Sequence, residues 1–201
     1  MTKSQGVTML KPIKLFIMLI FGTLISACSM LEDSSSMTSL FDGGNLQNWE
    51  EVGNAEWRLN NGYVEGSGDA GFLVSQQAYG DFRLTVEFWT DGPANSGVFI
   101  RCDDKQNIGA DNCYEVNIFD TRTDQTYRTG GIVNVAPPAE SIDAANQWNS
   151  FEILAQGSHL VVIMNGIETV NVSNEQLASG YIALQYGTGV VRFGDVRIQQ
   201  L

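Results

Sequence analysis

Histidine is almost absent from this chain of 201 residues, because His159 is the only one. It follows the turn-like pair Gly157-Ser158, so we expect it at the surface. A Ser/His/Asp hydrolase needs a histidine beside its nucleophile, and a histidine-based metal centre needs several histidines. The sequence supports neither kind of site, and we predict no catalytic metal and no required cofactor.

Basic residues are also scarce. The chain has 11 lysines and arginines against 23 acidic residues, and its formal net charge is −12. Proteins that bind nucleic acid carry a basic stripe or patch to neutralise phosphates. No such stripe is present, so we expect no nucleic-acid partner, and the acidity is typical of a solvated surface.

Cysteine is limited to three residues. Cys102 and Cys113 flank a loop-like segment, and in an oxidising compartment we predict a disulfide between them. Two isolated cysteines cannot complete a tetrahedral metal site. The aspartates of this segment offer oxygen ligands for a structural calcium, although we favour a solvated acidic loop; they are Asp103, Asp104 and Asp111.

The N-terminal segment predicts export. Its only charges are three lysines, and they precede an apolar run from Leu15 to Ile25 that is too short for a membrane-spanning helix. The run ends in Ser26-Ala27-Cys28, which resembles the lipobox of bacterial lipoproteins. An ordinary cleaved signal is the alternative, and Met9 is an alternative start to Met1.

We therefore expect a signal peptide over residues 1–27, lipidation at Cys28, a Ser-rich tether over 28–38 and one domain over 39–201. The membrane contact would be the lipid alone. Ser29 follows the cysteine where aspartate would signal retention at the inner membrane, so the resemblance implies the outer membrane.

The domain shows strand patterns almost throughout. Arg83 to Trp89 alternates cleanly between polar and apolar residues, and Asn165-Gly166 between two apolar runs is a strong hairpin signal. Many short strands without crossover helices predict an all-β antiparallel sandwich or jelly roll. The size is sufficient to bury a core.

Alternation also assigns residues to faces, because successive side chains of a strand point to opposite sides. The predicted non-core face mixes aromatics, an arginine, carboxylates and amides, and its members are Glu87, Trp89, Phe99, Arg101, Glu115, Asn117 and Gln185. This mixture suits a site for a polar small molecule between apolar walls. Cross-strand ion pairs of Arg101 with Glu87 or Glu115 are the competing interpretation.

Several motifs in order resemble one known family. They are Leu40-Phe41-Asp42-Gly43, Tyr79-Gly80-Asp81-Phe82, Asn95-Ser96-Gly97-Val98-Phe99-Ile100-Arg101, Tyr114-Glu115-Val116-Asn117-Ile118-Phe119-Asp120, Trp148-Asn149 and Ala183-Leu184-Gln185. Together they resemble the family formerly called DUF1080, now the 3-keto-disaccharide hydrolase or 3-keto-glucoside lyase/hydratase domain. The resemblance runs from about Ser39 to Leu201 and implies a concanavalin A-like jelly roll.

The resemblance also implies a substrate, a glycoside oxidised to a ketone at sugar carbon 3. Such a ketone acidifies the proton on carbon 2, so elimination and rehydration cleave the glycosidic bond. On this basis we assign Glu115 as the base, with Asp120 or Glu87 second, and Arg101 as the group that holds the enolate charge. The amides would bind hydroxyls and the aromatics would wall the ring; the substrate-binding set is Glu87, Trp89, Asn95, Phe99, Asn117 and Gln185.

The chain departs from the family pattern at three places. Tyr186-Gly187 stands where many members have a histidine, Val133 stands at the tyrosine of a Gly-x-Ile-Tyr block, and Phe193-Gly194-Asp195 stands where the family has Phe-Arg-Asn. These departures leave two functions open: a carbohydrate-cleaving enzyme, which we favour, and a non-catalytic carbohydrate-binding module on the same fold.

Overall fold

The structure, a computed structural model, describes residues 1–2 and 36–201. The predicted lipidation site Cys28, almost all of the predicted signal segment and the tether up to residue 35 lie outside the described residues. Among the described residues, no helix has the length and apolar character that crossing a membrane requires.

Within the described residues, the chain forms eleven strands and one short 3₁₀ helix, as the alternation predicts. The strands are β1 Thr38–Phe41, β2 Trp49–Asn60, β3 Tyr63–Ser75, β4 Phe82–Thr90, β5 Ser96–Cys102, β6 Tyr114–Ile118, β7 Trp148–Gln156, β8 His159–Met164, β9 Ile167–Ser173, β10 Tyr181–Tyr186 and β11 Val191–Gln200. The helix η1 spans Gln125–Tyr127. The all-β prediction is confirmed.

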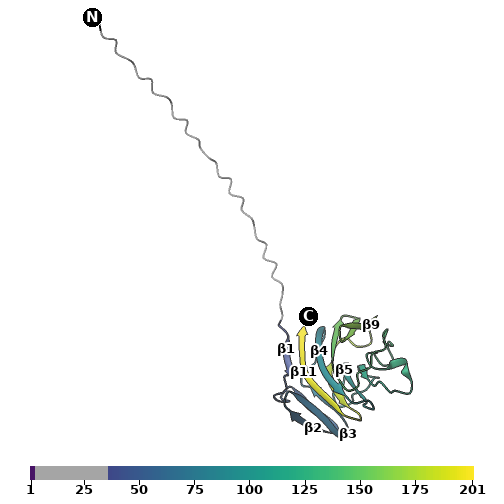
Figure 1. Ribbon diagram of the computed structural model, residues 1–201. Helices are drawn as coiled ribbons and strands as arrows, with labels where there is room; N and C mark the ends of the chain where they lie inside the picture. The colour runs from purple at the N-terminus through teal and green to yellow at the C-terminus, as the bar shows by residue number, and fades with distance from the viewer. Residues whose placement is uncertain (3–35) are drawn as a thin grey trace. The chain divides into compact units, whose positions relative to one another are not determined.

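The strands hydrogen-bond in the order β6-β5-β10-β3-β11-β4-β7-β8-β9, with β2 added to β3 and β1 added to β11. The named strand pairs are antiparallel. The long strand β3 changes partner along its length, because residues 71–74 pair with β10 and residues 64–66 pair with β11. Figure 1 shows the curled arrangement that results, with β1 and β11 side by side.

One large apolar core lies between the two halves of this curled sheet. The half with β5, β6 and β10 contributes side chains such as Val98 and Leu184, and the half with β4, β7 and β8 contributes Phe88, Phe151 and Val162. The rings of Phe88 and Phe151 lie 4.7 Å apart between their centroids. Burying each such side chain stabilises the fold by about 1.5–3 kcal/mol. Both halves of the sheet turn one face toward this core. The opposite face of each half is therefore an outer face, and the two outer faces point away from each other.

The predicted hairpin at Asn165-Gly166 joins β8 to β9. Both turn residues have positive φ, 51° at Asn165 and 81° at Gly166, as a type I′ turn requires. His159 is exposed, as predicted, and its Nε2 lies 2.9 Å from Oδ1 of Asn171. The predicted disulfide between Cys102 and Cys113 is present.

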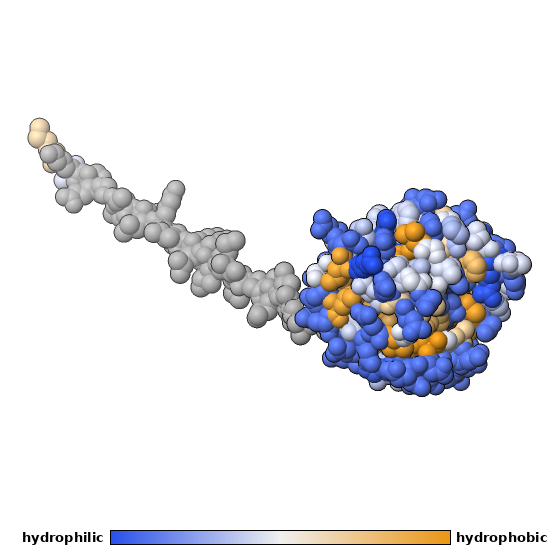
Figure 2. Space-filling model, turned by 90° about the horizontal axis from the view of Figure 1, so that it is seen from below, coloured by the Kyte–Doolittle hydropathy of each residue, from blue (hydrophilic) through white to orange (hydrophobic). Residues whose placement is uncertain are grey.

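The face of the domain that Figure 2 shows is mainly hydrophilic. Figure 2 shows apolar residues reaching the surface in separate areas that hydrophilic residues surround, rather than in one continuous patch. Among the exposed large apolar residues of the domain, Trp148 is the aromatic one, with 49% of its surface accessible.

Candidate functional site

Four of the predicted site residues share one outer face of the sheet. Register places Glu115 of β6 opposite Phe99 of β5, and Asn117 opposite Gly97. In turn, Gln185 of β10 lies opposite Phe72 of β3. We call this surface the Glu115 face and define it by Phe72, Gly97, Phe99, Glu115, Asn117 and Gln185.

Two phenylalanines form an apolar floor beside the carboxylate. The rings of Phe72 and Phe99 meet edge to face, with centroids 5.5 Å apart and planes at 89°. Gly97 keeps the adjoining position open, because a Cβ there would lie 3.2 Å from the Phe99 ring and 3.3 Å from the Glu115 carboxylate. The absence of a side chain at Gly97 therefore lets Glu115 lie directly against the aromatic floor.

Burial against this floor changes the acidity of Glu115. Desolvation raises the pKa of its carboxyl to about 7, and the positive charge of Arg122 opposes that rise in part. The carboxylate has no hydrogen-bond donor among the described residues. A carboxyl with a pKa near neutrality can take up and return a proton under physiological conditions.

A second polar group on this face also lacks a partner. The side-chain oxygen of Gln185 is buried and accepts no hydrogen bond within the described part of the chain. Buried polar atoms are almost always hydrogen-bonded, since each unsatisfied one costs about 1–3 kcal/mol. The Gln185 oxygen is therefore an unsatisfied acceptor beneath the Glu115 face, and it can reach a polar group from outside only when the amide turns outward.

The β5–β6 loop covers one end of the face. Cys102 and Cys113 close this loop and pack in a small second cluster with Val74, Phe99 and Ala183. Lys105 ties the loop to β2 through a 2.9 Å ion pair with Glu50, and its ammonium group lies 5.1 Å from the centre of the Tyr181 ring. The disulfide-closed loop therefore borders the Glu115 face at one end.

The β6–β7 connection borders the other side, and two predicted site residues hold it in place. The Asn117 amide donates to the carbonyl oxygen of Tyr127. Asp120 accepts hydrogen bonds from the Thr129 hydroxyl and from the backbone N–H groups of Ala144 and Ala145. The structure therefore gives Asp120 the role of a loop anchor rather than that of a base reaching a substrate.

Arg101 does not lie on the Glu115 face, which corrects the alternation-based expectation. Between the pairs Phe99–Ala183 and Cys102–Tyr181, β5 has one residue more than β10. This bulge, where Arg101 has a φ of 53°, turns the arginine to the core side and leaves Cys102 on the side of Phe99.

The arginine is fully buried at the end of the sandwich. Its guanidinium donates to the carbonyl oxygens of Gly80, Gly157 and Leu177, and it forms a 2.9 Å ion pair with Asp81. A side chain whose donors bind three loops in this way cannot also hold an enolate beside Glu115.

Glu87 and Trp89 also lie away from Glu115. They belong to the outer face of β4, and β5, β10, β3 and β11 separate β4 from β6 in the sheet. Trp89 stacks against Arg192, whose guanidinium carbon lies 4.6 Å from the ring centre. Asn95 precedes β5, and its backbone pairs with Thr188 at the end of the Glu115 face.

Two contributors to the site have no counterpart in the sequence prediction. Phe72 lies in β3, a strand whose glycines obscure its alternation, and Arg122 lies in an irregular loop with no periodic signal. Among residues 1–2 and 36–201, no group of three or more histidine, cysteine or carboxylate side chains is arranged to hold a metal ion. Asp104 instead caps its own turn by accepting from the N–H of Gln106.

An antiparallel sandwich of this topology, curled around one core, is the concanavalin A-like jelly roll found in glycoside-cleaving and carbohydrate-binding proteins. The chain matches the model of the 3-keto-alpha-glucoside-1,2-lyase-like domain over residues 36–199, and it belongs to that family. Both the family and the fold predicted from the sequence are thereby confirmed. No curated protein matches the chain.

Solved structures agree with the fold. A protein from Parabacteroides distasonis ATCC 8503, described as a proposed glycosyl hydrolase, is 17% identical with a TM-score of 0.74, over 84% of this chain and 95% of its own. The carbohydrate-binding module CBM66 from Bacillus subtilis is 18% identical with a TM-score of 0.62, over 76% and 96% of the two chains. A β-glucanase from Bacillus licheniformis is 16% identical with a TM-score of 0.59, over 83% and 99%.

Proposed function

We propose that the protein cleaves 3-keto-glycosides by elimination followed by hydration, and that Glu115 is the general base. The observation that carries the proposal is the setting of Glu115: its carboxyl is desolvated on an aromatic floor, has no hydrogen-bond donor among the described residues and has a pKa of about 7. Family membership supports the substrate class.

In the first step, the Glu115 carboxylate would take the proton from carbon 2 of the keto-sugar. The electrons of that C–H bond form an enolate with the ketone, and the enolate then expels the oxygen on carbon 1. The leaving oxygen receives the proton from Glu115, and the sugar retains a double bond between carbons 1 and 2. General base catalysis of this kind contributes about 10²- to 10⁴-fold in rate.

In the second step, water adds across that double bond. Glu115, again ionised, would take a proton from the water as its oxygen bonds to carbon 1, and would return the proton to carbon 2. One glycosidic bond and one water are consumed and two hydroxyl-bearing products are formed, so the net reaction is hydrolysis.

Other residues of the face would bind the sugar. Phe72, which is partly exposed, would present apolar surface to the ring, with the 2% exposed Phe99 packed behind it, and the Gln185 oxygen would accept a hydrogen bond from a hydroxyl once the amide turns outward. Arg122 is the cation whose charge acts on Glu115, and it replaces Arg101 as the candidate for holding enolate charge.

The test is an assay of Glu115→Gln with a 3-keto-disaccharide and with the unoxidised disaccharide. We expect wild-type protein to cleave only the ketone and the variant to lose at least about 10²-fold in kcat/KM. The control is Glu152→Gln, an exposed carboxylate on β7 that should retain the wild-type rate. An unchanged rate in Glu115→Gln would refute the assignment of the base.

A non-catalytic carbohydrate-binding module is the second candidate. The similarity to CBM66 favours it, as does the withdrawal of Arg101 from the outer face. Calorimetric binding of unoxidised glycans by wild-type protein, without turnover of any 3-keto-disaccharide, would establish this function in place of the first.

We also propose that the protein is exported and lipid-anchored at Cys28, facing carbohydrate in the cell envelope of a bacterium, in the outer membrane where one exists. The lipobox resemblance supports this proposal. Labelling with a radioactive fatty acid should mark wild-type protein and leave Cys28→Ser unmarked. Equal labelling of the two proteins would refute the anchor.

A further inference from the structure

An exposed tryptophan stands beside a hollow on the opposite side of the sandwich from Glu115. Trp148 begins β7 and is 49% exposed. The hollow has a volume of about 390 Å³, and its lining residues are Glu87, Trp148, Asn149, Ser150 and Asn165. We call it the Trp148 hollow. It shares no residue with the Glu115 face.

Local backbone geometry creates the space. β11 bulges between Phe193 and Val196, and Gly194 lies in that bulge under the side chains of Glu87 and Trp148. A Cβ at Gly194 would lie 3.0 Å from the Glu87 carboxylate and 3.2 Å from the Trp148 ring. Glycine therefore allows both side chains to lie close to the sheet at this point.

Neighbouring residues hold the tryptophan and the hollow's rim in place. The Tyr63 ring meets Trp148 edge to face, with centroids 6.0 Å apart. The Asn165 amide donates to the side-chain oxygen of Asn149, and the Asn165 oxygen accepts from the N–H of Ser150. These hydrogen bonds give the hollow a rigid amide edge.

Three polar groups of the hollow have no partner among the described residues: the Glu87 carboxylate, the Trp148 indole N–H and the Ser150 hydroxyl. The carboxylate accepts hydrogen bonds, the indole N–H donates one and the hydroxyl does both. Together they match the hydroxyls of a sugar, which both donate and accept. The tryptophan adds a flat apolar surface beside them. Flat aromatic surface with a few directed polar groups is typical of a small-molecule site.

The charges around the Trp148 hollow favour a neutral sugar over an acidic one. The free carboxylate of Glu87 repels anions, and the nearby Arg192 is already engaged by Glu65 at 2.6 Å and by the rings of Tyr63 and Trp89. No unpaired cation therefore lines the hollow to attract an acidic sugar.

We propose that the Trp148 hollow is a second carbohydrate site, which binds a neutral pyranose with its ring against Trp148 and its hydroxyls on Glu87 and Ser150. This site is separate from the proposed catalytic face and does not depend on it. A glycan held here would keep the domain on a polysaccharide while the other side of the sandwich remains free.

The test uses the full-length protein and two neutral probes, cellopentaose and maltopentaose. The indole N–H signals of the tryptophans are followed by NMR, and the Trp148 signal is identified by its loss in Trp148→Phe. At roughly 10 mM probe, well above a millimolar dissociation constant, we expect the Trp148 signal to move with at least one probe. No movement with either probe would overturn the proposal.

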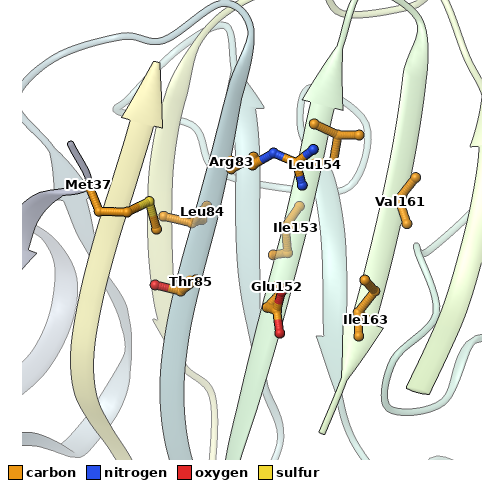
Figure 3. A pocket seen from close by; sticks show the side chains of 9 residues that line it. All are labelled: Met37, Arg83, Leu84, Thr85, Glu152, Ile153, Leu154, Val161 and Ile163. Atoms are coloured by element: carbon orange, nitrogen blue, oxygen red, sulfur yellow. The ribbon is translucent and has the colours of Figure 1, made fainter. Parts of the chain in front are cut away.

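Calorimetry with the same probes then tests the individual groups. Trp148→Ala should weaken binding at this site by about tenfold or more, the scale of removing an aromatic binding hot spot. Glu87→Gln, which preserves size, should weaken it several-fold if Trp148→Ala does not fold. The control is Glu152→Gln, which should bind like wild type. Glu152 lies on β7, as Trp148 does, but its side chain lines the separate apolar pocket shown in Figure 3.

Two further outcomes would overturn the proposal. One is loss of binding in Glu115→Gln while Trp148→Ala binds like wild type, which would place the glycan on the Glu115 face. The other is tighter binding of an oligogalacturonide than of either neutral probe, which would contradict the role of the Glu87 charge.

Discussion

Replacing Glu115 by glutamine should remove activity and raise stability together. Glutamine has nearly the same shape but no charge, so the aromatic floor of Phe72 and Phe99 would remain packed. In wild-type protein, the raised pKa of about 7 means that the folded state holds its proton more tightly than the unfolded state, where the usual value is about 4.5. Ionising Glu115 therefore costs folding free energy, and the variant avoids that cost.

The sign and magnitude follow from proton linkage. Below about pH 4.5 both states hold the proton, and the wild type has its full stability. As pH rises toward 7 the unfolded state loses the proton first, so the wild type loses stability over that interval and levels off above it. A shift of about 2.5 pKa units corresponds to at most about 3 kcal/mol at pH 8.

The assay compares urea unfolding of the wild type and Glu115→Gln between pH 4.5 and 8.5. We expect the two to be similar at pH 4.5, and the variant to be more stable at pH 8 by about 1–3 kcal/mol, or about 3–9 °C in Tm for a domain of this size. Over the same range, wild-type kcat/KM should rise through pH 7 and then level off, because only the ionised base is active.

Parallel stability curves for the two proteins at all pH values would refute the desolvated state of Glu115. A wild-type rate that falls as pH rises through 7 would refute its role as a base. The two results are independent, so the electrostatic reasoning and the catalytic assignment can fail separately.

Three other variants test the remaining assignments. Arg101→Leu removes the buried guanidinium that donates to the carbonyl oxygens of Gly80, Gly157 and Leu177, so it should lower the free energy of unfolding by about 3–5 kcal/mol in urea while the folded fraction keeps its turnover; normal stability with lost turnover would instead return Arg101 to the site. The double variant Cys102→Ser and Cys113→Ser should lose about 2–3 kcal/mol from loop closure and show a raised KM, and an unchanged KM would show that the loop does not shape the site. Asp120→Asn should lose about 1–2 kcal/mol and expose residues 121–147 to proteolysis, and a stable variant with reduced kcat would support its original assignment as a second base.

Strand alternation was sufficient to place the central part of the site. Glu115 and Asn117 on one strand, Phe99 on the next and Gln185 on a third share an outer face because each lies in a regular stretch of its strand. The strong composition contrast between inner and outer positions in these strands makes the assignment possible from sequence. The motif that resembles the family lies over the same strands, and the family match confirms it.

Two kinds of information were not available from alternation. A bulge adds a residue without any change in composition, so nothing in Val98-Phe99-Ile100-Arg101 reveals that Arg101 turns inward. Strand order is also absent from a local pattern, and Glu87 was grouped with Glu115 although four strands separate them in the sheet. Long-range pairing, which depends on the entire core, determines that order.

The bulge in β5 has a consequence for how this strand tolerates insertions and deletions. Because Ile100 and Arg101 both turn toward the core side, deleting Arg101 would restore simple alternation and leave Phe99 and Cys102 facing outward as before. The same deletion in the regular strand β6 would instead turn Glu115 or Asn117 to the opposite side of the sheet. Strand register would therefore survive that deletion, and its cost would be the loss of the guanidinium that binds the carbonyl oxygens of Gly80, Gly157 and Leu177.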